Sequence, residues 1–492
     1  MTPSSSDPGR HMLEGTIHVF LAQALFPLTA LITTAFLTRR LGPEGYGLLV
    51  LAATLAVWVE VSIDSLFSRA AIKFVGNAQD WRPIGSTIAR LHLIASGSAA
   101  VLLVLLSVPL ARLLNEPVLA GYLGLFALNI PLASLAHAHR NVLVGCGGFA
   151  QGALMSASRW IARLVLIVLF VQLGLSVPGA ILGSIGASLV ELIMGQRYVR
   201  LSLLHRAPIP VPPLFWSHVL PLFLSALSLS CYNRLDLFAL KALGATAVQA
   251  GMYGAAQNLS LLPGLFAASF SPLLLATLSR LLRDGRASLA REISRNAIRA
   301  VLGLLPVAAM IAGATHEIVG FFFGTLFLPA AQLLGMLIFG AVALVMISVA
   351  IAIVTAAGKP RWTLILTGPL VPLAVIGHLL LIPRFGPLGA SIVTTLLAGV
   401  GALVAVLAIY RLWQIVPPTM TLGRSILVSG LAYALALLWP VPGSLVLPKL
   451  LVISSVVLLA FLVLGEFGKS EIAMVRSILP WRTEPTQHPH EV

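Results

Sequence analysis

Two pairs of ionisable residues stand inside apolar stretches of the sequence. Glu60 and Asp64 are four residues apart in one stretch, and Arg159 and Arg163 are four apart in another. Residues at this spacing share a helical face, where like charges repel each other by roughly 0.2–0.5 kcal/mol. Each pair is therefore expected to face opposite charge. Either the acids and arginines hold each other in a structural network, or the arginines bind an anionic ligand.

A third stretch contains Arg234 and Asp236, which are two residues apart. On a helix these side chains point to nearly opposite sides and cannot pair locally. One interpretation is a structural ion pair with another helix. The other places Arg234 in a hydrated cavity, where it binds an anion. Asp236, Glu60 and Asp64 are then candidates for binding a coupling ion, because a charged side chain within a membrane span is energetically costly and is usually functional.

Bulk composition identifies the surroundings of these residues. Hydrophobic residues make up 58% of the 492 positions and charged residues 10%, against about 25% charged in soluble domains. Apolar runs of about twenty residues recur, each long enough to cross a bilayer as a helix. The chain is therefore predicted to be a polytopic membrane protein. The net charge of +15 is explained by basic loops that fix orientation, so we expect no nucleic-acid partner.

The pattern predicts an all-α membrane protein of about fourteen helices, over residues 14–38, 45–67, 91–113, 119–138, 155–174, 178–198, 217–240, 247–275, 298–315, 331–356, 363–382, 387–410, 422–440 and 446–466. An even number places both termini on one side. With the termini in the cytoplasm, 24 of the 31 Lys and Arg residues lie at the cytoplasmic side and 6 at the other, as the positive-inside rule requires. The first run is too long for a cleavable signal peptide.

Other residues give weaker signals. Arg69 and Arg140 lie at the predicted inner surface, more typical of orientation determinants or lipid-phosphate contacts than of a substrate entry site. Glu191 is a further acid within a span, for which the sequence indicates no partner. His137 and His139 have the wrong spacing for one helical face, so we expect no metal site there. The two cysteines, Cys146 and Cys231, predict neither a metal site nor a disulfide framework.

An internal repeat divides the chain. "RRLGPEGYGLLVLA" (39–52) and "LKALGATAVQAGMYGAA" (240–256) align through Gly42 and Gly244 with an offset of 202 residues, and "PGAIL" (178–182) aligns with "LGASI" (388–392) with an offset of 210. Duplication of a six-span unit gives two lobes in parallel, and transporters of this kind bind substrate between the lobes. Each glycine-flanked elbow would join the first two helices of a lobe, with glycine allowing a tight turn and close helix approach.

These expectations give the following organisation: a disordered cytoplasmic N-terminus (1–12), a first lobe (13–200), a cytoplasmic linker (201–216), a second lobe (217–410), two further helices (411–468) and a cytoplasmic tail (469–492). The stretch 279–299 is predicted to be a basic amphipathic helix on the inner surface. The stretch 313–330 is interpreted as a re-entrant or interfacial segment.

The sequence resembles the polysaccharide-flippase branch of the multidrug/oligosaccharidyl-lipid/polysaccharide (MOP) superfamily, which includes the Wzx-type O-antigen flippases. The motifs that carry the resemblance are "TRRLGPEGYGLLVLA", "YNRLDLFALKALGATAVQAGMYGAAQNLSLLP", "AAGKPRWTLI" and "LIPRFGPLGASIVTTL", and they extend over residues 13–410. The resemblance implies alternating access that turns an undecaprenyl-diphosphate-linked glycan from the inner to the outer leaflet of the bacterial inner membrane. It implies lipid-linked oligosaccharide and membrane lipids as partners, with a polysaccharide polymerase complex as a further one, and no cofactor.

For such a substrate, the candidate binding residues are Arg234, Arg159, Arg163, Arg69 and Arg140. Two transporters remain as alternatives. A MATE-type cation-coupled drug exporter commonly has an acid in its first helix, and none stands between Glu14 and Glu44. A lipid II flippase has an Arg-Glu-rich first elbow, which is not seen here.

A membrane-embedded glycosyltransferase or polymerase is a third alternative, of another class. It would need a sizeable outer loop, and only His316 and Glu317 offer a case for catalysis. A transporter, not an enzyme, is therefore expected. The sequence contains no P-loop motif, so coupling to a proton gradient, a sodium gradient or the membrane potential stays open.

Overall fold

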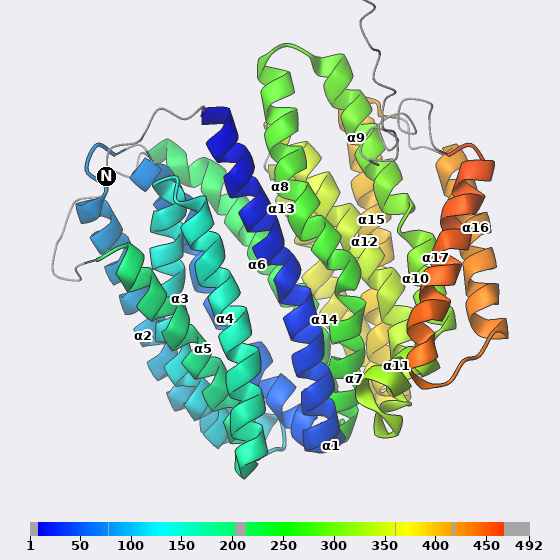
Figure 1. The fold of residues 1–492 in the computed structure, drawn as a ribbon, viewed down its shortest axis with the longest axis horizontal. Helices are drawn as coiled ribbons and strands as arrows, with labels where there is room; N and C mark the ends of the chain where they lie inside the picture. The colour runs from blue at the N-terminus through cyan, green and yellow to red at the C-terminus, as the bar shows by residue number, and fades with distance from the viewer. Residues whose placement is uncertain (1–7, 77, 202–212, 360, 416–418, 467–492) are drawn as a thin grey trace, which may run out of the picture.

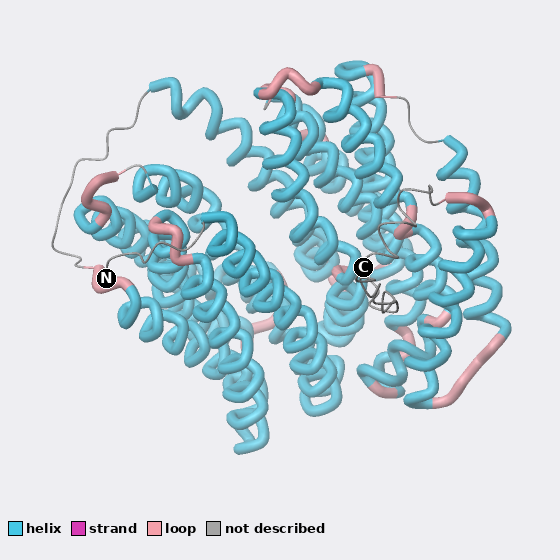
Figure 2. Tube along the Cα trace, turned by 45° about the horizontal axis from the view of Figure 1, so that its top comes forward, coloured by secondary structure: helices cyan, strands magenta, loops and turns pink. Residues whose placement is uncertain are grey.

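The computed structural model describes residues 8–76, 78–201, 213–359, 361–415 and 419–466, and within these ranges it contains helices and loops but no strand (Figure 2). Figure 1 shows α2–α5 gathered on one side, α7–α15 on the other, and α1 between them. The first lobe consists of α1 (Pro8–Gly76), α2 (Arg82–Leu113), α3 (Leu119–Gly145), α4 (Phe149–Phe170), the π-helical turn η1 (Val171–Leu175) and α5 (Ser176–Tyr198).

In the second lobe, some membrane spans consist of two consecutive shorter helices. The helices of this lobe are α6 (Pro213–Ala242), α7 (Ala247–Ser260), α8 (Leu262–Arg283), α9 (Ala287–Leu302), α10 (Leu305–Gly313), α11 (Thr315–Phe323), η2 (Thr325–Phe327), α12 (Ala330–Ala356), α13 (Arg361–Thr367), α14 (Leu370–Phe385) and α15 (Pro387–Trp413). The chain continues with α16 (Thr419–Leu438), η3 (Gly443–Leu445) and α17 (Val446–Val463).

The prediction of about fourteen spans is confirmed. Among the described residues, 11 helical segments are long and apolar enough to cross a membrane, and two of them, Leu25–Ser68 and Phe149–Tyr198, each hold two predicted spans. Helix α6, of 30 residues, supplies the remaining one. Helix α1 is divided at Gly42, whose φ of 67° is favourable only for glycine. The kink separates the first two spans at the predicted elbow.

One expectation about the connections needs correction. The stretch 279–299 is not one surface helix, because α8 ends at Arg283 and α9 begins at Ala287 after a turn in which Gly285 has a φ of 72°. Figure 1 shows α8 and α9 as an upright hairpin. Helix α9 buries one side, including Ala290 and Ile298, so it continues into a span with α10.

The structure describes only parts of the predicted N-terminal region and linker. Helix α1 begins at Pro8 and α6 at Pro213, so residues 8–12 and 213–216 are helical. The rest of the predicted N-terminal region, most of the linker and the tail 469–492 lie outside the described residues. In the stretch 313–330 the structure has the short helices α11 and η2.

The two elbows meet at one end of the molecule, the elbow face, defined by Gly42 and Gly244. A Cβ atom added to Gly47 would lie 2.0 Å from the carbonyl oxygen of Ala247, and one added to Gly251 would lie 2.0 Å from that of Pro43. The backbones of α1 and α7 are therefore in direct contact, which only glycine permits. These glycines bring the two lobes together, whereas the sequence predicts that they allow close helix approach within each hairpin.

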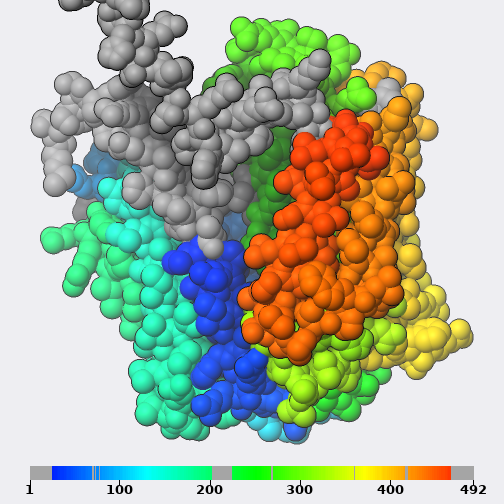
Figure 3. Space-filling view, turned by 45° about the vertical axis from the view of Figure 1, so that its right-hand side comes forward, coloured from blue at the N-terminus to red at the C-terminus, as the bar shows by residue number. Residues whose placement is uncertain are grey.

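Helices α16 and α17 lie against the second lobe, as Figure 3 shows in orange and red. Charged contacts fix both ends of this helical pair. At the elbow face the buried Lys449 donates to Glu317 of α11 at 2.5 Å. At the other end Arg299 and Arg424 donate to Glu466 at 2.5 and 2.9 Å. These contacts indicate that the pair supports the second lobe.

The contact between Gly47 and Ala247 makes a prediction about stability. Gly47→Ala should lower the stability of the folded protein by about 1–3 kcal/mol, because the added methyl group forces the helices apart. The measurement is the melting temperature of the purified protein in detergent. Gly97→Ala in α2 is the matched control, since nothing lies within 4 Å of the position of its added Cβ. Equal melting temperatures for the two variants would contradict this packing.

Candidate functional site

A buried network of charged groups lies within the first lobe. Arg159 of α4 donates to Glu191 of α5 at 3.2 Å, and its other terminal nitrogen is 3.7 Å from Glu60 of α1. Arg140 of α3 donates to the second oxygen of Glu191 at 2.9 Å. His137 Nε2 lies 2.9 Å from Arg159. Glu60 and Glu191 are almost wholly buried, so these contacts replace the water that both carboxylates lose.

Two asparagines of α3 complete the network. Asn129 donates to Glu60 at 2.5 Å, and Asn141 donates to Asp64 at 3.0 Å. Asp64 is also 3.8 Å from His137. These two asparagines and the two arginine partners of Glu191 were not identified from the sequence. The available signal was the presence of polar side chains inside an apolar stretch. The network joins α1, α3, α4 and α5 and makes the first lobe one unit.

The structure separates the two arginines that share a face of α4. Arg159 faces the acids, as one of the two interpretations expected. Arg163 does not: within the described part of the chain its guanidinium has no ion pair or hydrogen bond, and its Nε is buried without a partner. Arg163 is half-buried, and its charge interacts with that of Glu60 without a direct contact.

The second lobe holds Asp236 in a different environment. Its carboxylate is completely buried and accepts hydrogen bonds from Tyr253 at 2.6 Å, Gln257 at 3.0 Å and Thr394 at 3.4 Å. All three donors are neutral, and no cation contacts this carboxylate among the described residues. The charge of Arg234 acts on this carboxylate without a direct contact. A buried acid whose direct contacts are all neutral is a group that can bind a proton or a metal cation.

Arg234 points away from Asp236, as the spacing predicted. It is half-buried and makes no ion pair or hydrogen bond with any residue that the structure describes. The structural ion pair with another helix is therefore not found for either residue. Both α6, which holds Arg234, and α4, which holds Arg163, pack against α1 at the junction of the lobes. The side chain of Arg69, on α1, is not among those that the structure describes.

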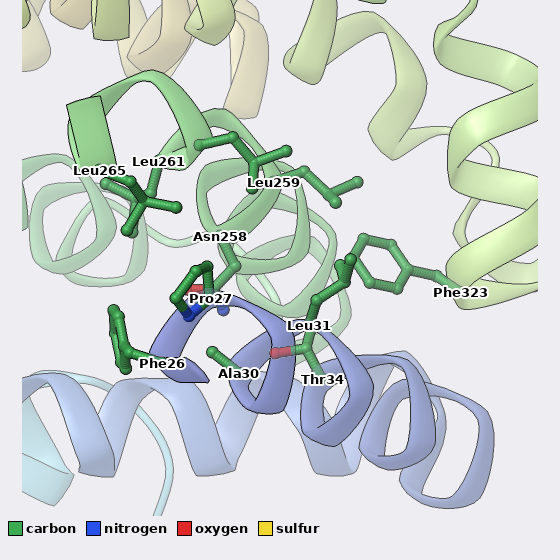
Figure 4. Close-up of a pocket in the computed structure, with 11 residues that line it drawn as sticks. Phe26, Pro27, Ala30, Leu31, Thr34, Asn258, Leu259, Leu261, Leu265 and Phe323 are labelled. Atoms are coloured by element: carbon green, nitrogen blue, oxygen red, sulfur yellow. The ribbon is translucent and has the colours of Figure 1, made fainter. Parts of the chain in front are cut away.

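A small pocket lies between the two lobes, with a volume of about 90 Å³. Figure 4 shows Phe26, Pro27 and Leu31 of α1 on one side, and Leu259 and Leu265 of the second lobe on the other. Its few polar groups include Thr34 and Asn258, and none of the candidate charged residues lines it. The pocket therefore suits hydrocarbon better than a charged group.

The fold of the chain is similar to those of solved membrane transporters. A lipid II flippase MurJ in an inward closed conformation matches with 15% identity and a TM-score of 0.74, over 95% of this chain and 100% of that chain. A mutant of the MATE transporter VcmN from Vibrio cholerae matches with 16% identity and a TM-score of 0.58, over 82% and 97%. A MOP superfamily transporter from Pyrococcus furiosus matches with 14% identity and a TM-score of 0.60, over 84% and 99%. At these identities the likeness shows the fold.

The family follows from the sequence comparison. The model of the family described as "Polysaccharide biosynthesis protein" matches residues 36–332, which is more than half of the chain. The chain therefore belongs to this family, and the resemblance to polysaccharide flippases drawn from its motifs is confirmed. No curated protein sequence matches it.

The first-lobe network predicts a strong dependence on Glu191. Glu191→Gln should lower stability by about 3–5 kcal/mol, because it leaves Arg140 and Arg159 buried without their shared counter-charge. The melting temperature in detergent measures this. The control is Glu292→Gln on α9, where the acid is exposed. If both variants have the melting temperature of the wild type, the network does not stabilise the lobe.

Proposed function

We propose that the protein is a flippase that moves a polyprenyl-diphosphate-linked oligosaccharide, a repeat unit of O-antigen or exopolysaccharide, from the inner to the outer leaflet of the bacterial inner membrane. The observation that carries the proposal is one arginine in each lobe, Arg163 and Arg234, half-buried at span depth without a partner among the described residues. A charge there costs about 2.5–3.5 kcal/mol on insertion scales. A diphosphate supplies the missing counter-charge.

The chemistry of the ligand fits that of the arginines. A diphosphate diester carries a negative charge on each phosphate, and the guanidinium fork binds phosphate oxygens bidentately. Arg159 and Arg140 are held by Glu191, so in this proposal they brace the first lobe, and Arg163 rather than Arg159 meets the head group. The apolar pocket between α1 and α8 accommodates part of the lipid tail during passage.

Asp236 is proposed as the site of a coupling ion. Its oxygens face a phenol, an amide and a hydroxyl, which are groups that support either a protonated acid or a bound cation. Glu60 and Asp64 are weaker candidates, because amides and a basic side chain already satisfy them. Binding at Asp236 would act on the second lobe alone.

The orientation and the partners belong to the same proposal. With both termini in the cytoplasm, the elbow face lies on the outer side of the membrane, as the 24-to-6 distribution of basic residues supports. A polysaccharide polymerase complex would receive the glycan there. A lipid II flippase shares the fold, and a MATE exporter shares it too, but two unpaired arginines favour an anionic substrate over a cationic drug.

The arginines make the first prediction for transport. Arg163→Gln and Arg234→Gln should each lower the flipping rate about tenfold or more, because a hydrogen bond to a charged group contributes about 1.5–3 kcal/mol. The measurement is flipping of a fluorescent undecaprenyl-diphosphate oligosaccharide in proteoliposomes, at matched protein content. Arg40→Gln, which removes an exposed arginine, is the control. Full activity in both site variants would refute the role of these arginines, and no flipping by the wild type would refute the function.

The second prediction for transport concerns Asp236. If it carries the coupling ion, flipping by the wild type should rise when a proton or sodium gradient is imposed across the liposome. Asp236→Asn keeps the size of the side chain and one acceptor oxygen, but it replaces the other oxygen by an amide donor and cannot hold the ionic charge. We expect this variant to flip at a rate that no longer responds to either gradient. A preserved gradient response would move the coupling site elsewhere.

A further inference from the structure

Two cations at the elbow face bind across the boundary between the lobes. Arg39 ends the first span of the first lobe, and Lys241 ends α6, the first span of the second lobe. The offset of 202 residues that aligns Gly42 with Gly244 also aligns Arg39 with Lys241. The proposed transport of a diphosphate lipid uses neither residue, so their matched positions need another explanation.

Arg39 reaches the second lobe. Its Nε donates to the carbonyl oxygen of Phe322 at 3.2 Å, and its Nη2 donates to that of Phe321. Both carbonyls belong to the last turn of α11, where helical donors have run out. The negative end of the helix dipole also favours a cation at this position. Helix α11 lies in the connection between the third and fourth spans of the second lobe.

Lys241 reaches the first lobe in the equivalent way. Its Nζ donates to Glu116 at 2.9 Å and to the carbonyl oxygen of Ala245 at 2.9 Å. Glu116 lies between α2 and α3, which is the connection between the third and fourth spans of the first lobe. In each lobe, the cation at the end of the first span thus contacts the connection between the third and fourth spans of the other lobe.

We propose that Arg39 and Lys241 form a reciprocal pair of latches, which hold the elbow face closed and must release before the space between the lobes opens on that side. This inference rests on the alternating-access part of the proposed function. Contacts that exist in only one of two conformations set the equilibrium between them. The latches would therefore control how often the protein opens toward the elbow face.

The two latches differ in their surroundings. Lys241 is 4% exposed, whereas Arg39 lies at the surface. An ion pair whose cation is shielded from water is stronger than hydrogen bonds from an exposed cation to neutral carbonyl oxygens. Loss of the Lys241 latch should therefore shift the equilibrium more than loss of the Arg39 latch.

The test is a distance measured across the elbow face by pulsed electron paramagnetic resonance. Spin labels are placed at Leu113→Cys on α2 and Leu326→Cys on η2, whose side chains are 62% and 69% exposed, after Cys146→Ser and Cys231→Ser. Because the labels sit on different lobes, their separation increases when this face opens. The protein is reconstituted in nanodiscs without substrate.

Two substitutions release one latch each and leave the buried lysine in place. Glu116→Gln should raise the population of the long-distance state several-fold, and Arg39→Gln should raise it by less. Arg39→Lys, which keeps the cation, should remain close to the parent. The matched control is Arg40→Gln, since Arg40 is exposed and contacts no group by hydrogen bond or ion pair within the described ranges.

Distance distributions for Glu116→Gln and Arg39→Gln that coincide with that of Arg40→Gln would overturn the latch. Arg39 is exposed, so its substitution tests the proposal even if the Glu116 variant does not fold. The measurement needs no cargo. Unchanged distances in a protein that flips lipid would refute the latch alone, whereas shifted distances in a protein that flips nothing would refute the proposed function alone.

Discussion

A charge inside the bilayer must be paired, and most of this molecule's polar structure follows from that requirement. Glu60 and Glu191 lie buried among apolar helices, and each is matched by Arg159. The pairing locks α1, α3, α4 and α5 into one body. Three residues are exceptions: Arg163, Arg234 and Asp236 form no direct ion pair among the described residues, although weaker charge interactions reach Arg163 from Glu60 and join Arg234 to Asp236. The proposed flippase would use these three positions for a charged head group and a coupling ion.

The second organising constraint is steric. The lobes can meet at the elbow face only because Gly47 and Gly251 remove the side chains between the backbones of α1 and α7. That close crossing brings Tyr46 within 2.7 Å of Asn258 across the boundary, and it places both elbow cations beside the opposite lobe. Sequence duplication therefore produces a joint with the same components on each side, which is a natural arrangement for two lobes that rock against each other.

Much of the fold could be predicted from the sequence, because span length and basic loops are set by the bilayer rather than by tertiary detail. The elbow glycines and the opposed directions of Arg234 and Asp236 also follow from local geometry. The partners of Glu191 could not be predicted, since Arg140 and Arg159 reach it from two other helices. The structure of the stretch 279–299 could not be predicted either. Its amphipathic pattern is compatible both with α9 packed in a hairpin and with a helix on the membrane surface.

The central claim is that unpaired arginines recognise a diphosphate, and an affinity comparison tests it most directly. Purified protein would be titrated with an undecaprenyl-diphosphate oligosaccharide and with the same oligosaccharide on undecaprenyl monophosphate. We expect the wild type to bind the diphosphate lipid at least tenfold more tightly, and a variant carrying both Arg163→Gln and Arg234→Gln to bind the two lipids alike. Equal affinities in the wild type, or a preference retained by the double variant, would contradict the account.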